Sequence, residues 1–180
     1  TMFDPTKTWL GFGNKSGGIV MTAGLESVTG QLWNLDTMQS VGFDYTNARL
    51  GLGLGGTVAS LVIVAAFNCP NASNLQQIDT SDWGVGVAIG GKWPTLISSL
   101  RRYRVLKRVL RLLESSAAVR IGANDIDELR NLGSILYSTY DVASTASEPK
   151  MITLDVPMAG YSVELSAAYS FGTKRINIYP

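Results

Sequence analysis

The clearest structural period in the chain lies at residues 93–118, which read WPTLISSLRRYRVLKRVLRLLESSAA. At about 100° per residue, its leucines and valines and Tyr103 fall on one stripe, a pattern that predicts an amphipathic α-helix. Pro94 suits the first turn, because its missing N–H would have no helical partner there. The stripe is wide enough to pack on a sheet, so we expect this helix to cover a hydrophobic core.

Six of the fifteen cations of the chain lie in this stretch. Five of them share the arc opposite the apolar stripe, namely Arg101, Arg104, Lys107, Arg108 and Arg111. Glu114 is the only acid that follows any of them three or four residues later, so the helix itself offers them little pairing. The arc can be a plain solvated face, the commonest role of such charges, or a surface that binds anions. Guanidinium groups are suited to phosphate, which keeps the second interpretation open.

The composition excludes several classes of protein. A chain of 180 residues is long enough to bury a core, and we expect residues 1–180 to form a single domain. The net charge is +1, so any electrostatic function must come from a patch. There is no histidine, and Cys69 is the only cysteine, which excludes a cysteine–histidine zinc site and Ser-His or Cys-His nucleophiles. We expect no cofactor, no metal, no catalytic residue and an ordinary thiol at Cys69.

Residues 7–91 have the pattern of short β-strands bounded by Gly, Asn or Asp. The candidate strands are residues 8–12, 18–23, 31–35, 39–45, 49–55 and 82–90. In the last two, apolar residues alternate with small ones, mostly glycine, so that one face of each strand is nearly bare. Such a face is expected where another element or a ligand approaches the backbone closely. Gly84 and Gly86 are therefore candidates for close packing, the simpler interpretation, or for a ligand-lined surface.

Residues 50–67 form an uncharged run of the length of a transmembrane candidate. The period of two in its first half and the turn signal at Gly55-Gly56 instead predict a hairpin with a buried second strand at 58–67. Residues 1–9 lack the basic-then-apolar pattern of a signal peptide, although a processed chain would look the same. We expect a soluble or peripheral protein.

Residues 41–67 read VGFDYTNARLGLGLGGTVASLVIVAAF, in which Val-Gly-Phe precedes glycine-rich alternation and a hydrophobic run. This segment resembles the SYLF family of lipid-binding domains, which show a similar succession. The resemblance covers this segment only and implies a lipid ligand. In that family lipid contact is associated with a basic amphipathic element ahead of the sheet, whereas the basic helix here follows these strands. No functional residue is therefore carried over.

The chain beyond the basic stretch predicts a second helix and then a return to strands. The helix is expected at about residues 125–140, with Asn124 as N-cap and acids in its first turn that favour the helix dipole. Strands are expected at residues 151–156, 161–171 and 175–179. The predicted fold class is α+β, a mainly antiparallel β sheet that can curl into a barrel, with a two-helix excursion at about residues 94–142.

Familiar catalytic and nucleotide-binding motifs are absent from the sequence. GFGNKSGG at 11–18 fails the spacing of a phosphate loop and predicts a β-turn. GLGLGG at 51–56 is followed by a β run, whereas a dinucleotide-binding fingerprint needs a helix there. The pairs Asp79/Asp82 and Asp125/Asp127 could act as acid and base, but loop solvation and helix capping explain them more simply.

Three functional hypotheses remain. The first is a non-enzymatic module that binds an anionic lipid or membrane surface through the basic helix and the glycine-lined β surface. The second is a protein-interaction or assembly subunit, either a homo-oligomer or a secreted effector-like protein, whose basic helix docks on an acidic protein partner. The third is a hydrolase or transferase that uses only carboxylates and hydroxyls. Nucleic-acid binding is disfavoured, because one basic helix in a nearly neutral chain lacks a broad basic footprint. The first hypothesis is preferred.

The candidate binding residues for the preferred hypothesis come from both predicted features. They are Arg101, Arg104, Lys107, Arg108 and Arg111 on the helix and Gly84 and Gly86 on the sheet.

Overall fold

The computed structural model describes residues 2–16, 19–20, 23–51, 60–76, 78, 98–100, 102–114, 120–144, 148–157, 168–171 and 176–180. The strands are β1 (Trp9–Ser16), β2 (Ile19–Val20), β3 (Ala23–Asn34), β4 (Ser40–Gly51), β5 (Ser60–Phe67), β6 (Lys150–Pro157), β7 (Ala168–Phe171) and β8 (Asn177–Tyr179). The helices are η1 (Pro5–Lys7), α1 (Ala72–Leu75), α3 (Arg104–Glu114), α4 (Ala123–Thr139) and η4 (Val142–Ser144).

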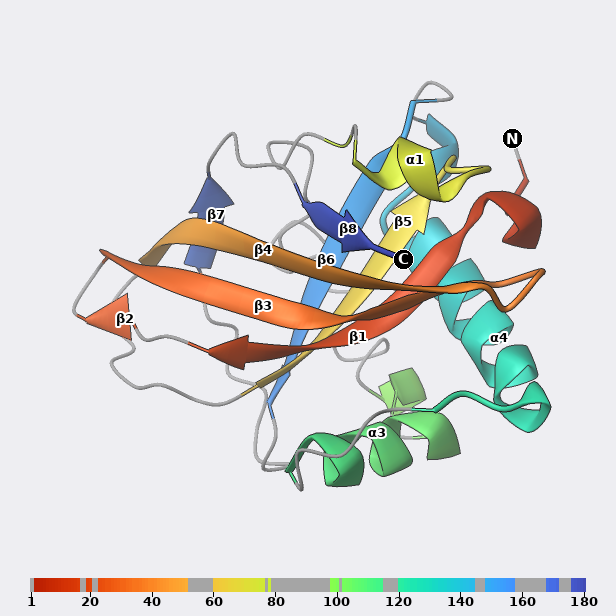
Figure 1. The fold of residues 1–180 in the computed structure, drawn as a ribbon, viewed down its shortest axis with the longest axis horizontal. Helices are drawn as coiled ribbons and strands as arrows, with labels where there is room; N and C mark the ends of the chain where they lie inside the picture. Colours follow the sequence, from red (N-terminus) through yellow and green to blue (C-terminus); the bar gives the residue numbers. More distant parts are fainter. Residues whose placement is uncertain are drawn as a thin grey trace.

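The strands form one antiparallel sheet (Figure 1). Its order is β6-β5-β1-β3-β4-β7, with β2 added to β3 and β8 added to β4. Within the described residues β6 and β7, at the two ends of this path, do not pair with each other, so the sheet is not closed into a barrel. The α+β class and the mainly antiparallel sheet predicted from the sequence are confirmed.

Strand β5 lies inside the sheet and is buried on both faces. Its neighbours are β1 and β6, while β1 and β3 separate it from β4. The hairpin predicted between β4 and β5 is therefore wrong. Alternate side chains of β5 enter two different hydrophobic clusters: Ile63, Ala65 and Phe67 pack in one, and Val62, Val64 and Ala66 in the other. A strand that is apolar on both faces is stabilised by an interior position, which outweighs the local turn signal.

Three of the strands, β1, β3 and β4, are longer than the sequence predicts. β3 and β4 have twelve residues each and pair along almost their whole length from Ala23↔Leu50 to Trp33↔Ser40. A tight connection joins them, in which the side-chain Oδ1 of Asn34 accepts the backbone N–H of Asp36 at 2.9 Å. β1 also continues to Ser16, so the β-turn predicted at 11–18 is wrong for residues 11–16. Pairing on both sides, with β3 and β5, keeps β1 extended.

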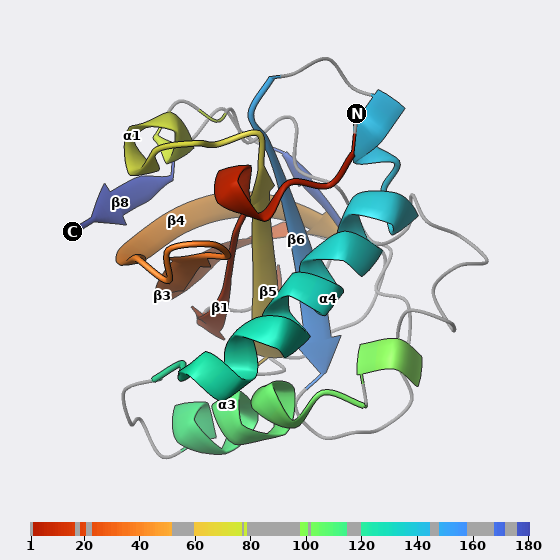
Figure 2. The ribbon, with the colours of Figure 1, turned by 90° about the vertical axis from the view of Figure 1, so that its right-hand side faces the viewer.

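The helices α3 and α4 lie against one face of the sheet (Figure 2). The predicted apolar stripe of α4 is buried there, as Ile126, Leu129, Leu132 and Leu136 show. Arg130 ties α4 to the turn after β3, since its Nε donates to the backbone oxygen of Leu35 at 2.7 Å. The other face carries the second cluster, to which Leu75 of α1 contributes. Both long helices fall within the excursion predicted at about residues 94–142.

The predicted basic helix is not continuous in the structure. A helical turn at residues 98–100 is followed by a break, and α3 begins at Arg104. The backbone N–H of Arg102 bonds to the oxygen of Ser99 at 3.1 Å and that of Tyr103 to Leu100 at 3.3 Å, both across three residues rather than four. Such tightened bonds are typical of a helix end. No described helix is long and apolar enough to cross a membrane.

Candidate functional site

The basic residues predicted as binding residues fall mainly on α3. Arg104, Lys107 and Arg111 are exposed, whereas Arg108 is half-buried. Arg101, Gly84 and Gly86 lie outside the described residues. On the other side of α3, the residues Val105, Leu106 and Val109 are buried in the cluster that joins the helix to the sheet and α4. The amphipathic orientation predicted for this helix is therefore confirmed over α3.

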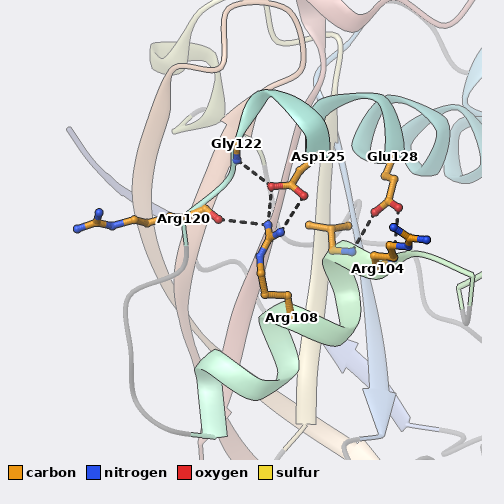
Figure 3. Close-up of polar contacts among 7 residues, drawn as sticks. Arg104, Arg108, Arg120, Gly122, Asp125 and Glu128 are labelled. Atoms are coloured by element: carbon orange, nitrogen blue, oxygen red, sulfur yellow. Dashed lines mark hydrogen bonds and ion pairs between the residues drawn. The ribbon is translucent and has the colours of Figure 1, made fainter.

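Arg108 and Asp125 form an ion pair between α3 and α4 (Figure 3). Arg108 Nη1 lies 3.0 Å from Asp125 Oδ1, and Nη2 lies 2.5 Å from Oδ2, so the guanidinium binds both carboxylate oxygens. Arg108 Nη2 also donates to the backbone oxygen of Arg120 at 3.3 Å. Asp125 Oδ2 accepts the backbone N–H of Gly122 at 2.8 Å, which confirms the helix-capping role expected for this acid.

The Arg108–Asp125 pair is a fixed pair of charges at neutral pH. The hydrogen bonds from Arg108 hold the pKa of Asp125 below its usual range, although burial acts in the opposite direction. The same contact raises the pKa of Arg108. The side chain of Asp125 is 11% exposed and that of Arg108 42% exposed, so the acid is largely shielded and the base reaches the surface. Arg108 is thus neutralised within the fold.

Glu128 forms the second polar contact between the two helices. Its Oε2 accepts the backbone N–H of Val105 at 2.9 Å, and its Oε1 accepts that of Arg104 at 3.3 Å (Figure 3). The first backbone N–H groups of a helix have no partner within it, and a carboxylate there also complements the helix dipole. Glu128 therefore fixes the start of α3 and stabilises it by about 1 kcal/mol. This contact places the start of α3 after the break at Arg102.

The structure changes how many of the predicted cations are available to a partner. The expectation that all five face outward together does not hold for Arg108, because Asp125 neutralises it. Among the residues whose side chains the structure describes, which leaves out Glu114, Lys107 and Arg111 make no ion pair with an acid. We define the basic face of α3 as Arg104, Lys107 and Arg111. These residues follow the spacing i, i+3 and i+7, which places them on one side of the helix.

The described groups that could take part in catalysis or metal binding are the acids and Cys69. No three acidic or cysteine side chains there gather into a metal-binding group. Burial raises the pKa of Cys69 to about 12, so this thiol is even less ionised at neutral pH than an ordinary thiol. Asp125 is taken up by Arg108, and Asp79 and Asp82 lie outside the described residues.

The sequence did not reveal that α4 supplies acids to α3. The wheel of one helix shows only partners within that helix, whereas Asp125 and Glu128 follow Arg108 by 17 and by 20 residues. A clue was nevertheless present, since a helix rich in cations precedes one whose first turns are acidic. Arg120 was also missed, because it lies outside both predicted helices. No protein-family model, curated protein or solved structure matches this chain.

Proposed function

We propose that this chain is a non-enzymatic module that binds anionic lipid surfaces through the basic face of α3. The observation that carries the proposal is the division of α3 into two sides. Its apolar side is buried, with Val105 and Val109 at 0% exposure, while Arg104, Lys107 and Arg111 are exposed on the opposite side. A rigidly mounted set of cations can approach a charged plane together, without any rearrangement of the helix.

The character of the surface around α3 favours a membrane over an acidic protein. The centre of a protein–protein interface is usually rich in aromatic and other large apolar side chains. Among the described residues, the large hydrophobic side chains that are exposed are Met2 and Tyr179, at 90% and 49%, and neither lies on α3. Among the described side chains, which leave out Leu110 and Leu113, this face of cations has no exposed apolar anchor, and such a face suits a plane of lipid headgroups, where charge gives binding.

Binding through this face would be superficial. An interfacial amphipathic helix inserts its apolar side among the acyl chains. In α3 that side is already part of the protein core, and exposing one such side chain costs about 1.5–3 kcal/mol. The cations therefore act at the headgroups, where each contributes on the order of 1 kcal/mol and the attraction fades over about one Debye length. The affinity should be modest and strongly dependent on salt.

The test is co-sedimentation of the protein with vesicles of phosphatidylserine in phosphatidylcholine. The variant Lys107→Gln/Arg111→Gln removes two cations of the basic face that make no ion pair among the side chains that the structure describes, and Gln is a comparable helix former. The matched control is Lys7→Gln/Lys150→Gln, which removes the same charge at the end of the sheet where β5 stops. Two contacts place those lysines there: Lys150 pairs with Phe67, and the backbone oxygen of Lys7 accepts the N–H of Cys69.

The α3 variant should bind about 30-fold more weakly, on a loss of about 2 kcal/mol. The control variant Lys7→Gln/Lys150→Gln should lose far less affinity for the vesicles. An ionic strength of about 1 M, which shortens the Debye length to about 3 Å, should abolish binding of the wild type. Equal losses in the two variants would mean that overall charge, and not the face of α3, drives binding. If the wild type binds no anionic vesicles, the proposal is wrong and the acidic-partner hypothesis takes its place.

A further inference from the structure

Arg120 lies beside the α3–α4 junction, outside both helices. Its side chain is exposed and points away from the Arg108–Asp125 pair, whereas its backbone oxygen is held by Arg108 Nη2 at 3.3 Å (Figure 3). We infer that Arg120 is a further lipid-contact residue of this module, and that Arg108 is a positioning residue that holds Arg120 next to the basic face of α3. The inference rests on the proposed function and deepens it.

The segment that carries Arg120 is tied to the junction by two hydrogen bonds. One runs from Arg108 to the backbone oxygen of Arg120, and the other runs from the backbone N–H of Gly122 to Asp125 Oδ2 at 2.8 Å. Both bonds end on the same ion pair, since Arg108 Nη2 lies 2.5 Å from Asp125 Oδ2. The ion pair thus joins α3, the start of α4 and the residue between them. Arg120 is held in place relative to α3 because Arg108, which belongs to α3, donates to its backbone oxygen.

Among the side chains that the structure describes, no acid forms an ion pair with the Arg120 guanidinium. The Arg108–Asp125 pair has no net charge, so it neither adds to the positive potential nor cancels it. Glu128 is used at the start of α3 through the backbone N–H groups of Arg104 and Val105. Asp127 is the exposed acid on this part of α4, and it opposes the cation. The contribution of Arg120 should therefore be no greater than that of Lys107.

This assignment exchanges the roles of two arginines. The helical wheel places Arg108 among the binding cations and cannot include Arg120. In the structure the guanidinium of Arg108 is occupied by a carboxylate and a backbone oxygen. A guanidinium suits such a role because its planar fork presents its donors in fixed directions, a geometry that a lysine ammonium cannot reproduce. Arg108 therefore affects lipid binding indirectly, by holding Arg120 in position.

The first experiment measures vesicle affinity in a double-mutant cycle. Arg120→Gln should weaken binding to phosphatidylserine vesicles about fivefold. Arg108→Gln/Asp125→Asn removes the ion pair at no change in net charge, and in that background Arg120→Gln should matter less than twofold, because the residue is no longer held in place. Arg108→Lys preserves the charge but should weaken binding, which a binding cation would not do. Circular dichroism identifies any variant that has lost its fold.

A second experiment locates the membrane relative to α4. A polarity-sensitive dye is attached to Asn124→Cys at the start of this helix or, as a matched control, to Ala143→Cys beyond its end; both positions are exposed. The sole native thiol, at Cys69, is buried and does not compete for the label. The two labels are separated by a helix of 17 residues, which is about 25 Å long. Vesicles should protect the label of the Asn124→Cys variant from an aqueous quencher and leave the label of the Ala143→Cys variant accessible.

The outcomes separate the inference from the proposed function. Absence of any vesicle binding by the wild type would refute the proposed function, and the inference with it. Binding by the wild type with unchanged affinity of Arg120→Gln would refute the inference alone. Equal quencher access at the two labels in bound protein would also refute it. Loss of affinity in both Arg120→Gln and Arg108→Lys, together with protection of the label on the Asn124→Cys variant, would support it.

Discussion

The close approach of β1 and β3 gives a sharp prediction about Gly30. An ideal Cβ on Gly30 would lie 2.0 Å from the backbone oxygen of Phe12 and 2.7 Å from the Cα of Gly13. Both contacts are with backbone, which cannot move aside by a change of rotamer. Gly11 on the facing strand has the same restriction, because its Cβ would lie 1.8 Å from the backbone oxygen of Gln31. Each strand thus approaches the backbone of the other too closely for a side chain at its own glycine, and we expect Gly30→Ala to be strongly destabilising.

The magnitude follows from the displacement that the methyl group would require. Relieving the contact means moving the oxygen of Phe12 from 2.0 Å to at least 3.0 Å, a shift of about 1 Å. Overpacking of this kind costs about 1–3 kcal/mol. β1 also pairs with β5 through Phe12↔Ile63, so the shift weakens hydrogen bonds on both sides of the strand, at about 1 kcal/mol each. Together these give a loss of about 3–5 kcal/mol from a total that is typically about 5–15 kcal/mol.

Gly42 provides the matched control. It lies in the neighbouring strand β4 and, like Gly30, is half-buried. A Cβ there would lie 3.6 Å from the Cβ of Tyr179, which is an ordinary contact. Gly42→Ala should therefore be neutral or stabilising by up to about 1 kcal/mol, because alanine reduces the freedom of the unfolded chain. Urea unfolding can be followed by the fluorescence of Trp9 and Trp33, which are buried in the two clusters. Equal stability of the two variants would refute the argument from backbone contact.

Two further predictions concern titration. The folded pKa of Asp125 is lowered, so its pairing with Arg108 contributes stability that is present above the ordinary value of 3.8 and is lost as pH falls through the folded pKa. The difference between the unfolding free energies at about pH 7 and about pH 3 should therefore be smaller in Asp125→Asn than in the wild type. Asp4 and Asp44, whose pKa values are also lowered, provide the pH dependence of stability that remains in the variant. An unchanged difference in Asp125→Asn would contradict this. Cys69, with its pKa raised to about 12, should react with a thiol reagent at neutral pH only as fast as local or global unfolding exposes it. A reaction that is as fast in native buffer as in urea would show that this thiol is not buried.

The fold class was accessible from the sequence because it depends on local periods. Side chains that alternate every second residue predicted strands, and a period of 3.6 predicted the helices. Strand partners were not accessible in this way. No sequence feature near the β-branched run at 60–67 identifies the strands that pair with it. Its neighbour in the sheet, β1, lies some fifty residues earlier in the chain. The turn signal at Gly55-Gly56 favoured a nearby partner, whereas burial of both faces of β5 required a place inside the sheet.

The candidate site shows the same limit in its charges. Val105 and Arg108 are three residues apart on α3, and their partners Glu128 and Asp125 are three residues apart on α4, in the opposite order. The two contacts therefore match only when the helices run in opposite directions in this one register. A slide of α3 by one turn, about 5.4 Å, would break both contacts at once and leave Arg108 on the surface with the other cations. The number of cations that a partner can meet is thus determined by helix packing, which single-helix periodicity does not contain. The neutral pair makes Arg108 part of the scaffold, and the lipid binding proposed for this face rests on the cations on either side of it.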